Sequence, residues 1–445
     1  MTTEIAVANR LGIALATDSA VTISGGGRVK VFNTADKLFE LSPQFPIGIM
    51  INGNMDCIGV PWEILVKDFR EGKGLEARDT VQDWAKDFLT YVEGHSLMAT
   101  QEAAQHIDDI IISEIFELQM SVVSTVRASI FELASNNKKI KLPPFEQIVD
   151  AYLTDRSKLI SQYPIADSLE GVAESDVISG YSDRIDELCK PRFEGRQLNE
   201  GEAIKFKSIV ANVLLRIVPS PTITGVVVAG YGSTETFPAV HAFEVDGRVL
   251  GKMKVTARDS NSIATSLDGG QVTSFAQTDV IQRLLGGADP KFVDKTADYI
   301  QTAVRKVAET IESQTRPKRL SRAERQKRAE LVEDLADVIR DEYENETTKS
   351  LTDEFSREFD RMIAMMPKQE LIELAEALVS ITAVERKATT DEGTVGGPID
   401  VAFITRHEGF VWIKRKHYFE AERNPRYFWR KYGNPPARIG GSGAH

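Results

Sequence analysis

The sequence is poor in cysteine, with only Cys57 and Cys189 among 445 residues. Two cysteines are too few for a disulfide framework or a cysteine-rich metal site, so we expect both to be buried thiols. The six histidines are scattered and form no pair at the spacing of helical metal ligands. We therefore expect neither a metal nor another cofactor.

Long apolar runs are also absent. No segment reaches the length of a membrane span, and the first residues, MTTEIAVANR, lack the charged-then-apolar order of a secretion signal. These features predict a cytoplasmic protein without membrane contact. The net charge of -12 repels phosphate backbones over most of the surface, which argues against nucleic-acid binding by the protein as a whole.

The chain alternates between strand-rich and helix-rich segments. Residues 4–19 form two alternating strands that read as a hairpin, and residues 37–41 and 47–53 form a second pair. Residues 76–217 follow a helical period over most of their length. The first strand block is therefore separated from the next by a long helical segment.

A second strand block follows the helical segment. Residues 223–232 and 239–251 have strand character, and Asp246-Gly247 is a strong hairpin signal. A last alternating strand is predicted at 398–406. Because both blocks are rich in hairpins and the helices are segregated from them, the sequence predicts an α+β fold with antiparallel sheets.

Three charged segments stand outside this alternation. Residues 316–328 are basic and residues 330–346 are acidic, a pattern typical of a solvated, salt-bridged helical arm. Residues 414–445 are basic with interleaved aromatics, which suits docking to an acidic partner or a nucleic acid. Packing of this tail on the protein's own acidic domain or on a neighbouring subunit is at least as good an interpretation.

The chemistry that stands out is at the N-terminus. If Met1 is removed, Thr2 carries a hydroxyl nucleophile and a free α-amine, whose pKa of about 7.7–8.0 suits a general base. A nearby cation would favour the neutral amine, and a carboxylate would hold that cation. Asp18 follows the second strand and Lys37 begins the third, so both are candidates for these roles.

The segment from Thr2 through Gly12-Ile-Ala-Leu-Ala-Thr-Asp18-Ser to Asp36-Lys37-Leu-Phe resembles the opening of proteasome-type β subunits, which are N-terminal nucleophile (Ntn) hydrolases. In that family Thr, Asp and Lys have the three roles just described. The resemblance implies a threonine peptidase on a four-layer αββα sandwich. It also implies catalytic roles for Thr2, Asp18 and Lys37.

Further parts of the family's site are implied around the fourth strand. The segment IGIMINGNMDCIG resembles the strand that carries the oxyanion donor, which points to the Asn52 N–H with Gly53 beside it. Met50 falls on the wall of the first specificity pocket. Thr22 falls where the backbone pairs with an extended peptide.

Two later segments complete the resemblance. Gly269 and Gly270 resemble a small-residue loop near the nucleophile. In TTDEGTVGG, Glu392 falls on the supporting acid of an Asp-x-x-Ser-Gly-Gly motif, and Asp391 fits with a shift of one residue. Val395 replaces the serine of that motif.

The resemblance defines part of the expected domain organisation. It assigns 1–75, 218–313 and 366–413 to an Ntn-hydrolase core. The helical period and the charge pattern, and not the resemblance, assign 76–217 to a helical insertion, 314–365 to a charged helical arm and 414–445 to a basic aromatic tail.

The expected substrate is a peptide or unfolded protein. The resemblance also suggests a homo-oligomer and an ATP-dependent unfoldase as partner. Two alternatives remain open: a catalytically impaired structural subunit on the same fold, and an Ntn amidase that acts on small molecules.

Overall fold

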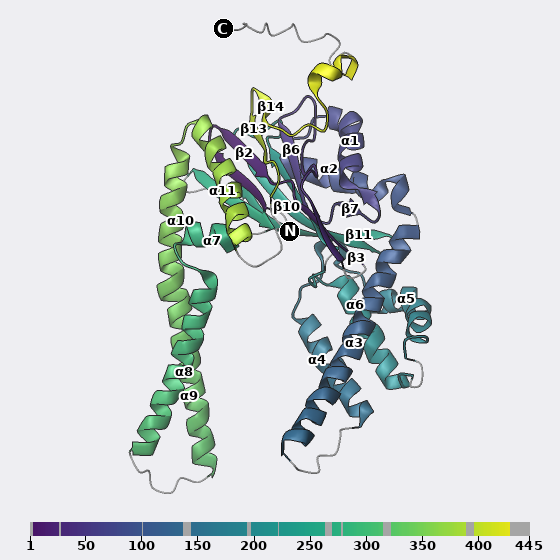
Figure 1. The fold of residues 1–445 in the computed structure, drawn as a ribbon, viewed down its shortest axis with the longest axis vertical. Helices are drawn as coiled ribbons and strands as arrows, with labels where there is room; N and C mark the ends of the chain where they lie inside the picture. The colour runs from purple at the N-terminus through teal and green to yellow at the C-terminus, as the bar shows by residue number, and fades with distance from the viewer. Residues whose placement is uncertain are drawn as a thin grey trace.

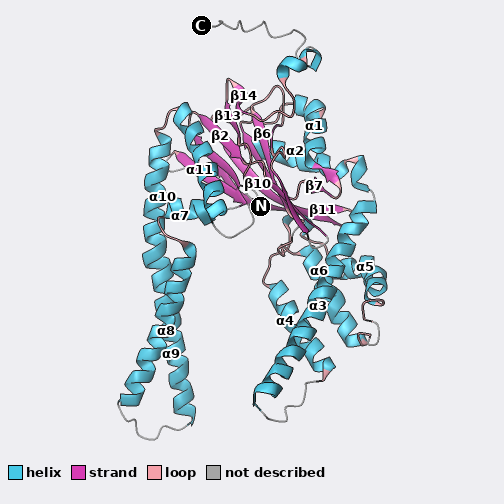
Figure 2. Cartoon of the chain, viewed as in Figure 1, coloured by secondary structure: helices cyan, strands magenta, loops and turns pink. Residues whose placement is uncertain are grey.

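The computed structural model describes residues 3–25, 28–99, 101–136, 144–193, 197–220, 222–262, 269–276, 279–314, 322–388 and 396–427. Strands lie at the centre of the molecule and helices surround them (Figure 2). The sheets are antiparallel, which confirms the predicted α+β class.

The first sheet has the strand order β12-β1-β2-β13-β14. Strands β1 and β2 form the hairpin predicted at the start of the chain, with Asn9 paired to Gly12. Strand β14, which was not predicted from the sequence, extends the sheet beyond the predicted last strand. The strands are β1 (Thr3–Asn9), β2 (Gly12–Thr17), β12 (Gly270–Ala276), β13 (Asp400–Thr405) and β14 (Gly409–Lys414).

The second sheet has the order β11-β10-β9-β6-β5. The predicted turn at Asp246-Gly247 is wrong: these residues form a bulge inside β10, where the pairing with β11 shifts between Val245 and Arg248. The chain turns instead at Leu250 and Gly251, both at positive φ, as a tight hairpin turn requires. The strands are β5 (Leu38–Glu40), β6 (Ile47–Gly53), β9 (Thr224–Gly230), β10 (Ala239–Val249) and β11 (Lys252–Ser262).

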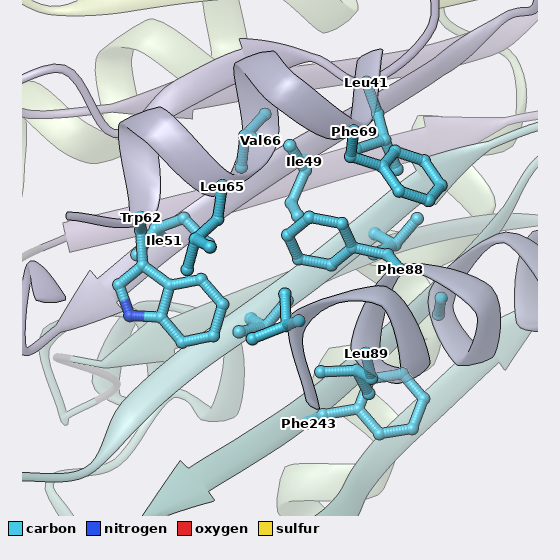
Figure 3. Packing of buried hydrophobic residues seen from close by; sticks show 14 of the residues in the cluster. Leu41, Ile49, Ile51, Trp62, Leu65, Val66, Phe69, Phe88, Leu89 and Phe243 are labelled. Carbon is cyan, nitrogen blue, oxygen red and sulfur yellow. The ribbon is translucent and has the colours of Figure 1, made fainter. Parts of the chain in front are cut away.

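The two sheets face each other, and helices cover both outer faces. The first sheet packs on α7 (Asp279–Gly286), α10 (Lys349–Ala364) and α11 (Lys368–Ala388). The second sheet packs on α1 (Trp62–Glu71) and α2 (Val81–Gly94), where Ile49 and Ile51 of β6 meet the aromatic side chains of both helices (Figure 3). The order of layers is helix, sheet, sheet, helix.

The alternation of side chains along β1 decides what faces the space between the sheets. Ile5 and Val7 pack against the helices that cover the first sheet. Ala6 and Ala8 pack instead into the core between the two sheets. By the same period of two, Glu4 belongs to the face that looks at the second sheet.

Two helical projections extend from the sheets in the same direction (Figure 1). In one, α8 and α9 run side by side, and Arg305 of α8 lies 2.6 Å from Glu333 of α9. In the other, α3 to α6 enclose a separate hydrophobic core. These helices are α3 (Gln101–Asn136), α4 (Phe145–Ser161), α5 (Glu174–Cys189), α6 (Glu200–Leu215), α8 (Pro290–Gln314) and α9 (Arg322–Glu342).

The short elements are β3 (Val21–Gly25) with β4 (Arg28–Phe32), β7 (Asp56–Cys57) with β8 (Val60–Pro61), and η1 (Lys73–Leu75), η2 (Ser96–Ala99), η3 (Asp167–Leu169), η4 (Tyr343–Thr348) and η5 (Ala421–Arg423). Among the helices of the described ranges, none has both the length and the apolar composition needed to cross a lipid bilayer.

Candidate active site

Asp18 and Lys37 form a buried ion pair between the two sheets. Asp18 directly follows β2, and Lys37 directly precedes β5. The Lys37 Nζ lies 2.9 Å from Asp18 Oδ1, and the two side chains are 0% and 1% exposed. Lys37 also donates a short hydrogen bond to the Ala20 carbonyl. The structure therefore brings together two of the residues on which the predicted chemistry depends.

The Asp18 carboxylate also binds backbone N–H groups from three segments. Its Oδ1 accepts from the Thr3 N–H at 3.1 Å. Its Oδ2 accepts from the Gly396 N–H at 3.0 Å and from the Ala20 N–H at 3.3 Å. These bonds fix the carboxylate and tie the start of β1 to the ion pair.

Three of the predicted catalytic residues, Thr2, Asp391 and Glu392, lie outside the described residues. Thr2 directly precedes Thr3, whose N–H binds Asp18. The segment of the two acids ends shortly before Gly396, whose N–H also binds Asp18. The described neighbours of these residues thus meet at one carboxylate.

Asn52 lies near the end of β6 and is 9% exposed. Its side-chain Nδ2 donates to Glu4 Oε2 at 2.9 Å, so the side chain is directed into the protein. Asn52 pairs with Gly225 of β9. A Cβ on residue 225 would lie 2.3 Å from Asn52 Oδ1, so only glycine leaves room for this side chain.

The backbone N–H groups of β6 point alternately to its two sides, which bears on the predicted oxyanion donor. The Ile51 N–H donates to the Lys37 carbonyl, whereas the Asn54 N–H donates to the Ile223 carbonyl on the opposite side of β6. Successive N–H groups of a strand point to opposite sides. The Asn52 N–H is therefore directed toward β9, and the Gly53 N–H is directed toward the side of Lys37. Gly53 is exposed, whereas Asn52 is buried.

Glu4 is a site residue that the sequence analysis missed. It is fully buried and faces Asn52. Burial raises the pKa of the Glu4 carboxyl to about 8; the Asn52 hydrogen bond and the Lys37 charge lower it, and the Asp18 charge raises it. The available signal was a single charged residue within the apolar strand Thr3–Asn9.

Burial also lowers the pKa of Lys37, an effect that the Asp18 charge and hydrogen bond oppose. The charge of Lys416 acts on Lys37 in the same direction as burial. Lys416 is held beside the site: its N–H donates to Asp400 Oδ1 at 2.8 Å, and its Nζ lies 3.2 Å from Asp36 Oδ1. This anchor, from the segment that follows β14, was also missed.

The prediction that Gly269 and Gly270 lie near the nucleophile is wrong. Gly270 pairs with Asn9, at the opposite end of β1 from Thr3. The residue opposite Thr3 is Ala276, which has a φ of 69°. The glycine pair resembles the family's loop but lies at the other end of β12.

The two remaining predicted site residues, Met50 and Thr22, are not among the hydrogen-bond partners of Asp18 and Lys37 given above. Met50 is fully buried and packs in the core between the sheets, so it forms core rather than the wall of an open pocket. The backbone of Thr22 lies in β3 and pairs with Val31 of β4. Within the described ranges, no group of three or more His, Cys, Asp or Glu side chains is arranged to hold a metal ion.

Comparisons with known proteins give little help. No family model matches the sequence. None of the curated proteins searched matches it either. Among solved structures, the chain is similar to a mutant of Anbu from Hyphomicrobium sp. strain MC1, with 9% sequence identity, 97% of this chain and 94% of that chain covered, and a TM-score of 0.25. A likeness this weak carries no argument, so the function must be inferred from the site.

Proposed function

We propose that the chain is a threonine-type N-terminal nucleophile hydrolase that cleaves peptide bonds after removal of Met1. The observation that carries the proposal is the buried Asp18–Lys37 ion pair, whose carboxylate also binds the N–H of Thr3. Thr3 directly follows Thr2 in the chain. The paired sheets between helical layers are compatible with the αββα sandwich of such hydrolases.

In the proposed reaction, the Thr2 Oγ attacks the substrate carbonyl carbon and its proton passes to the Thr2 α-amine. The tetrahedral intermediate collapses to an ester on Thr2, and the proton passes to the leaving nitrogen. Water then hydrolyses the ester with the amine as general base. Each step returns its proton, so the reaction needs no cofactor.

The proposed role of Lys37 is to supply positive charge to the reacting groups of Thr2. This charge disfavours protonation of the neighbouring amine and stabilises negative charge that develops on the hydroxyl oxygen. Asp18 holds the ammonium in place at 2.9 Å. The low exposure of both side chains strengthens their electrostatic effect, because burial reduces screening by water.

The oxyanion of the intermediate needs a fixed donor, and the Gly53 N–H is the proposed one. The expected homo-oligomer, the cytoplasmic location and an unfoldase partner belong to the same proposal. The helical projections α3–α6 and α8–α9 offer surfaces for such contacts.

The test is incubation with a peptide epoxyketone, followed by mass mapping of the adduct. We expect Met1 to be absent and the adduct to lie on Thr2. Thr2→Ala should abolish the adduct and hydrolysis of an unfolded protein. Thr302→Ala, the same substitution on the exposed surface of α8, should change neither.

Retention of Met1 in protein made without an N-terminal tag, together with no adduct, would contradict the proposal and favour the impaired structural subunit. Cleavage of short acylated amides without cleavage of unfolded protein would favour the small-molecule amidase.

A further inference from the structure

The Asn52 side chain has two neighbours, Glu4 and Gly225, that the proposed chemistry does not itself require. Its Nδ2 donates to Glu4 Oε2 at 2.9 Å. Its Oδ1 occupies space that a Cβ on Gly225 would enter at 2.3 Å. Both contacts are buried, since Glu4 is 0% and Asn52 is 9% exposed. The hydrogen bond to Glu4 of β1 therefore holds the Asn52 side chain, and Gly225 of β9 leaves the room that this side chain occupies.

Fixing Asn52 also fixes the donor next to it. The Gly53 N–H belongs to the peptide group that begins at the Asn52 carbonyl, so its direction follows the backbone of Asn52. Gly53 itself has a φ of 76°, and a Cβ there would lie 2.4 Å from the Ile223 carbonyl oxygen. Glycine is free to rotate where other residues are not. Its donor consequently depends on restraint from neighbouring residues.

We propose that Glu4 is a positioning residue, which holds Asn52 so that the Gly53 N–H stays directed toward the site of Asp18 and Lys37. This inference rests on the proposed function for its catalytic consequence. Its structural part, the dependence of the Gly53 peptide on Glu4, stands separately and can be measured without any activity.

The charged surroundings of Glu4 define how it should respond to pH. Asp18 at the end of β2 and Lys37 before β5 both act on its carboxyl, and Asn52 of β6 donates to it. Lys416 acts in turn on Lys37. The Glu4 Oε1 is buried and has no hydrogen-bond partner among the described residues. Protonation of this oxygen removes a buried charge and leaves the Asn52 contact on Oε2 intact.

The sequence offers a selective probe. Asn52-Gly53 is the only Asn-Gly pair in the chain. Protein labelled with carbonyl-¹³C asparagine and ¹⁵N glycine therefore gives one cross-peak in an amide-to-carbonyl NMR experiment, that of the Gly53 N–H. We expect this peak to shift with a midpoint near pH 8 in the wild type, where Glu4 titrates. Glu4→Gln should abolish the titration, and Glu4→Leu should move the peak at every pH.

Kinetics test the catalytic consequence. Glu4→Gln keeps an acceptor for Asn52 and should retain kcat within about threefold. Glu4→Leu removes the acceptor and should lower kcat about 100-fold with little change in KM, as for a displaced catalytic group. Asn52→Ala should have the same effect, and the double variant should be no worse than either one. Glu114→Gln, on a buried acid that pairs with Arg156 in the α3–α6 cluster, is the control for a general folding effect.

The outcomes distinguish the positioning role of Glu4 from the proposed hydrolase function. An unchanged Gly53 peak and unchanged kcat in Glu4→Leu would overturn the inference. A wild type without a Thr2 adduct, but with a Gly53 peak that depends on Glu4, would overturn the proposed function and support the positioning of this peptide.

Discussion

The Nζ of Lys37 lies 2.9 Å from the Oδ1 of Asp18, and the two side chains are 0% and 1% exposed to solvent. A buried charge that loses its partner destabilises a protein by about 3–5 kcal/mol. Asp18→Asn should therefore lower the free energy of unfolding by about that amount in urea denaturation. It should also abolish hydrolysis, because the ammonium is no longer held.

The matched control for this prediction is an exposed ion pair. Arg305 and Glu333 lie 2.6 Å apart on α8 and α9, with side chains 39% and 52% exposed. Exposed pairs contribute about 0–1 kcal/mol. Glu333→Gln should therefore cost less than about 1 kcal/mol. A similar decrease in the free energy of unfolding in both variants would show that burial does not make the Asp18–Lys37 pair more important for stability than an exposed pair.

The raised pKa of Glu4 predicts an unusual dependence of the free energy of unfolding on pH. The carboxyl ionises near 4.5 in the unfolded chain but near 8 in the folded protein. Between these values the folded state keeps a proton that the unfolded state has released. Its contribution to stability therefore falls as pH rises, by at most about 1.4 kcal/mol per pH unit. Below pH 4.5 and above pH 8 it should be constant.

The measurement is the free energy of unfolding of the wild type minus that of Glu4→Gln, taken from pH 4 to 9. Subtraction cancels the other titrating groups, which the two proteins share. The difference should fall from one plateau to another as pH rises. A flat difference would contradict the raised pKa of Glu4.

Local patterns explain which parts of the structure the sequence could predict. The β1–β2 hairpin and strands β5, β6 and β13 follow from alternation over a few residues, and Asp18 and Lys37 lie at their ends. The contacts of Glu4 with Asn52 and of Lys416 with Asp36 join residues far apart in the chain. No local period specifies such contacts, because they depend on how the two sheets are placed.

Strand register caused the errors. Gly270 pairs with Asn9, so five residues of β12 separate it from Ala276 at the Thr3 end. A glycine pair indicates where a chain can turn but does not identify the end of the partner strand it meets. The same limit applies to Asn52 and Gly53: the donor that faces Lys37 is decided by strand alternation, and a shift of one residue reverses it.

Lys416 connects the C-terminal segment to the site. Its Nζ pairs with Asp36 and with Asp400, whose side chain is 2% exposed. Lys416→Met leaves the Asp400 carboxylate without its cation, so we expect a loss of about 3 kcal/mol in urea denaturation. Removal of this charge should also raise the pKa of Lys37, since Lys416 lowers it.

Lys414→Met is the control for this prediction, because Lys414 pairs with Glu376 at the surface and is 57% exposed. It should cost less than about 1 kcal/mol. Equal losses in the two lysine variants would mean that Lys416 is not a buried anchor.

Gly225 and Asn52 provide a test of packing that does not depend on charge. A Cβ on residue 225 would lie 2.3 Å from Asn52 Oδ1 and 2.6 Å from its Nδ2. Gly225 does not have positive φ, so the obstacle to a side chain is steric. Gly225→Ala should displace the Asn52 amide from Glu4 and cost about 1–3 kcal/mol, the usual range for overpacking.

The double variant Asn52→Ala/Gly225→Ala shows whether that cost arises at Asn52. Removal of the Asn52 amide removes the atoms that the new Cβ would meet. Adding Gly225→Ala to Asn52→Ala should therefore cost much less than adding it to the wild type, which gives a coupling energy of about 0.5–3 kcal/mol in a double-mutant cycle. Strictly additive losses would mean that the alanine at 225 disturbs β9 by another route and that Gly225 does not serve the Asn52 side chain.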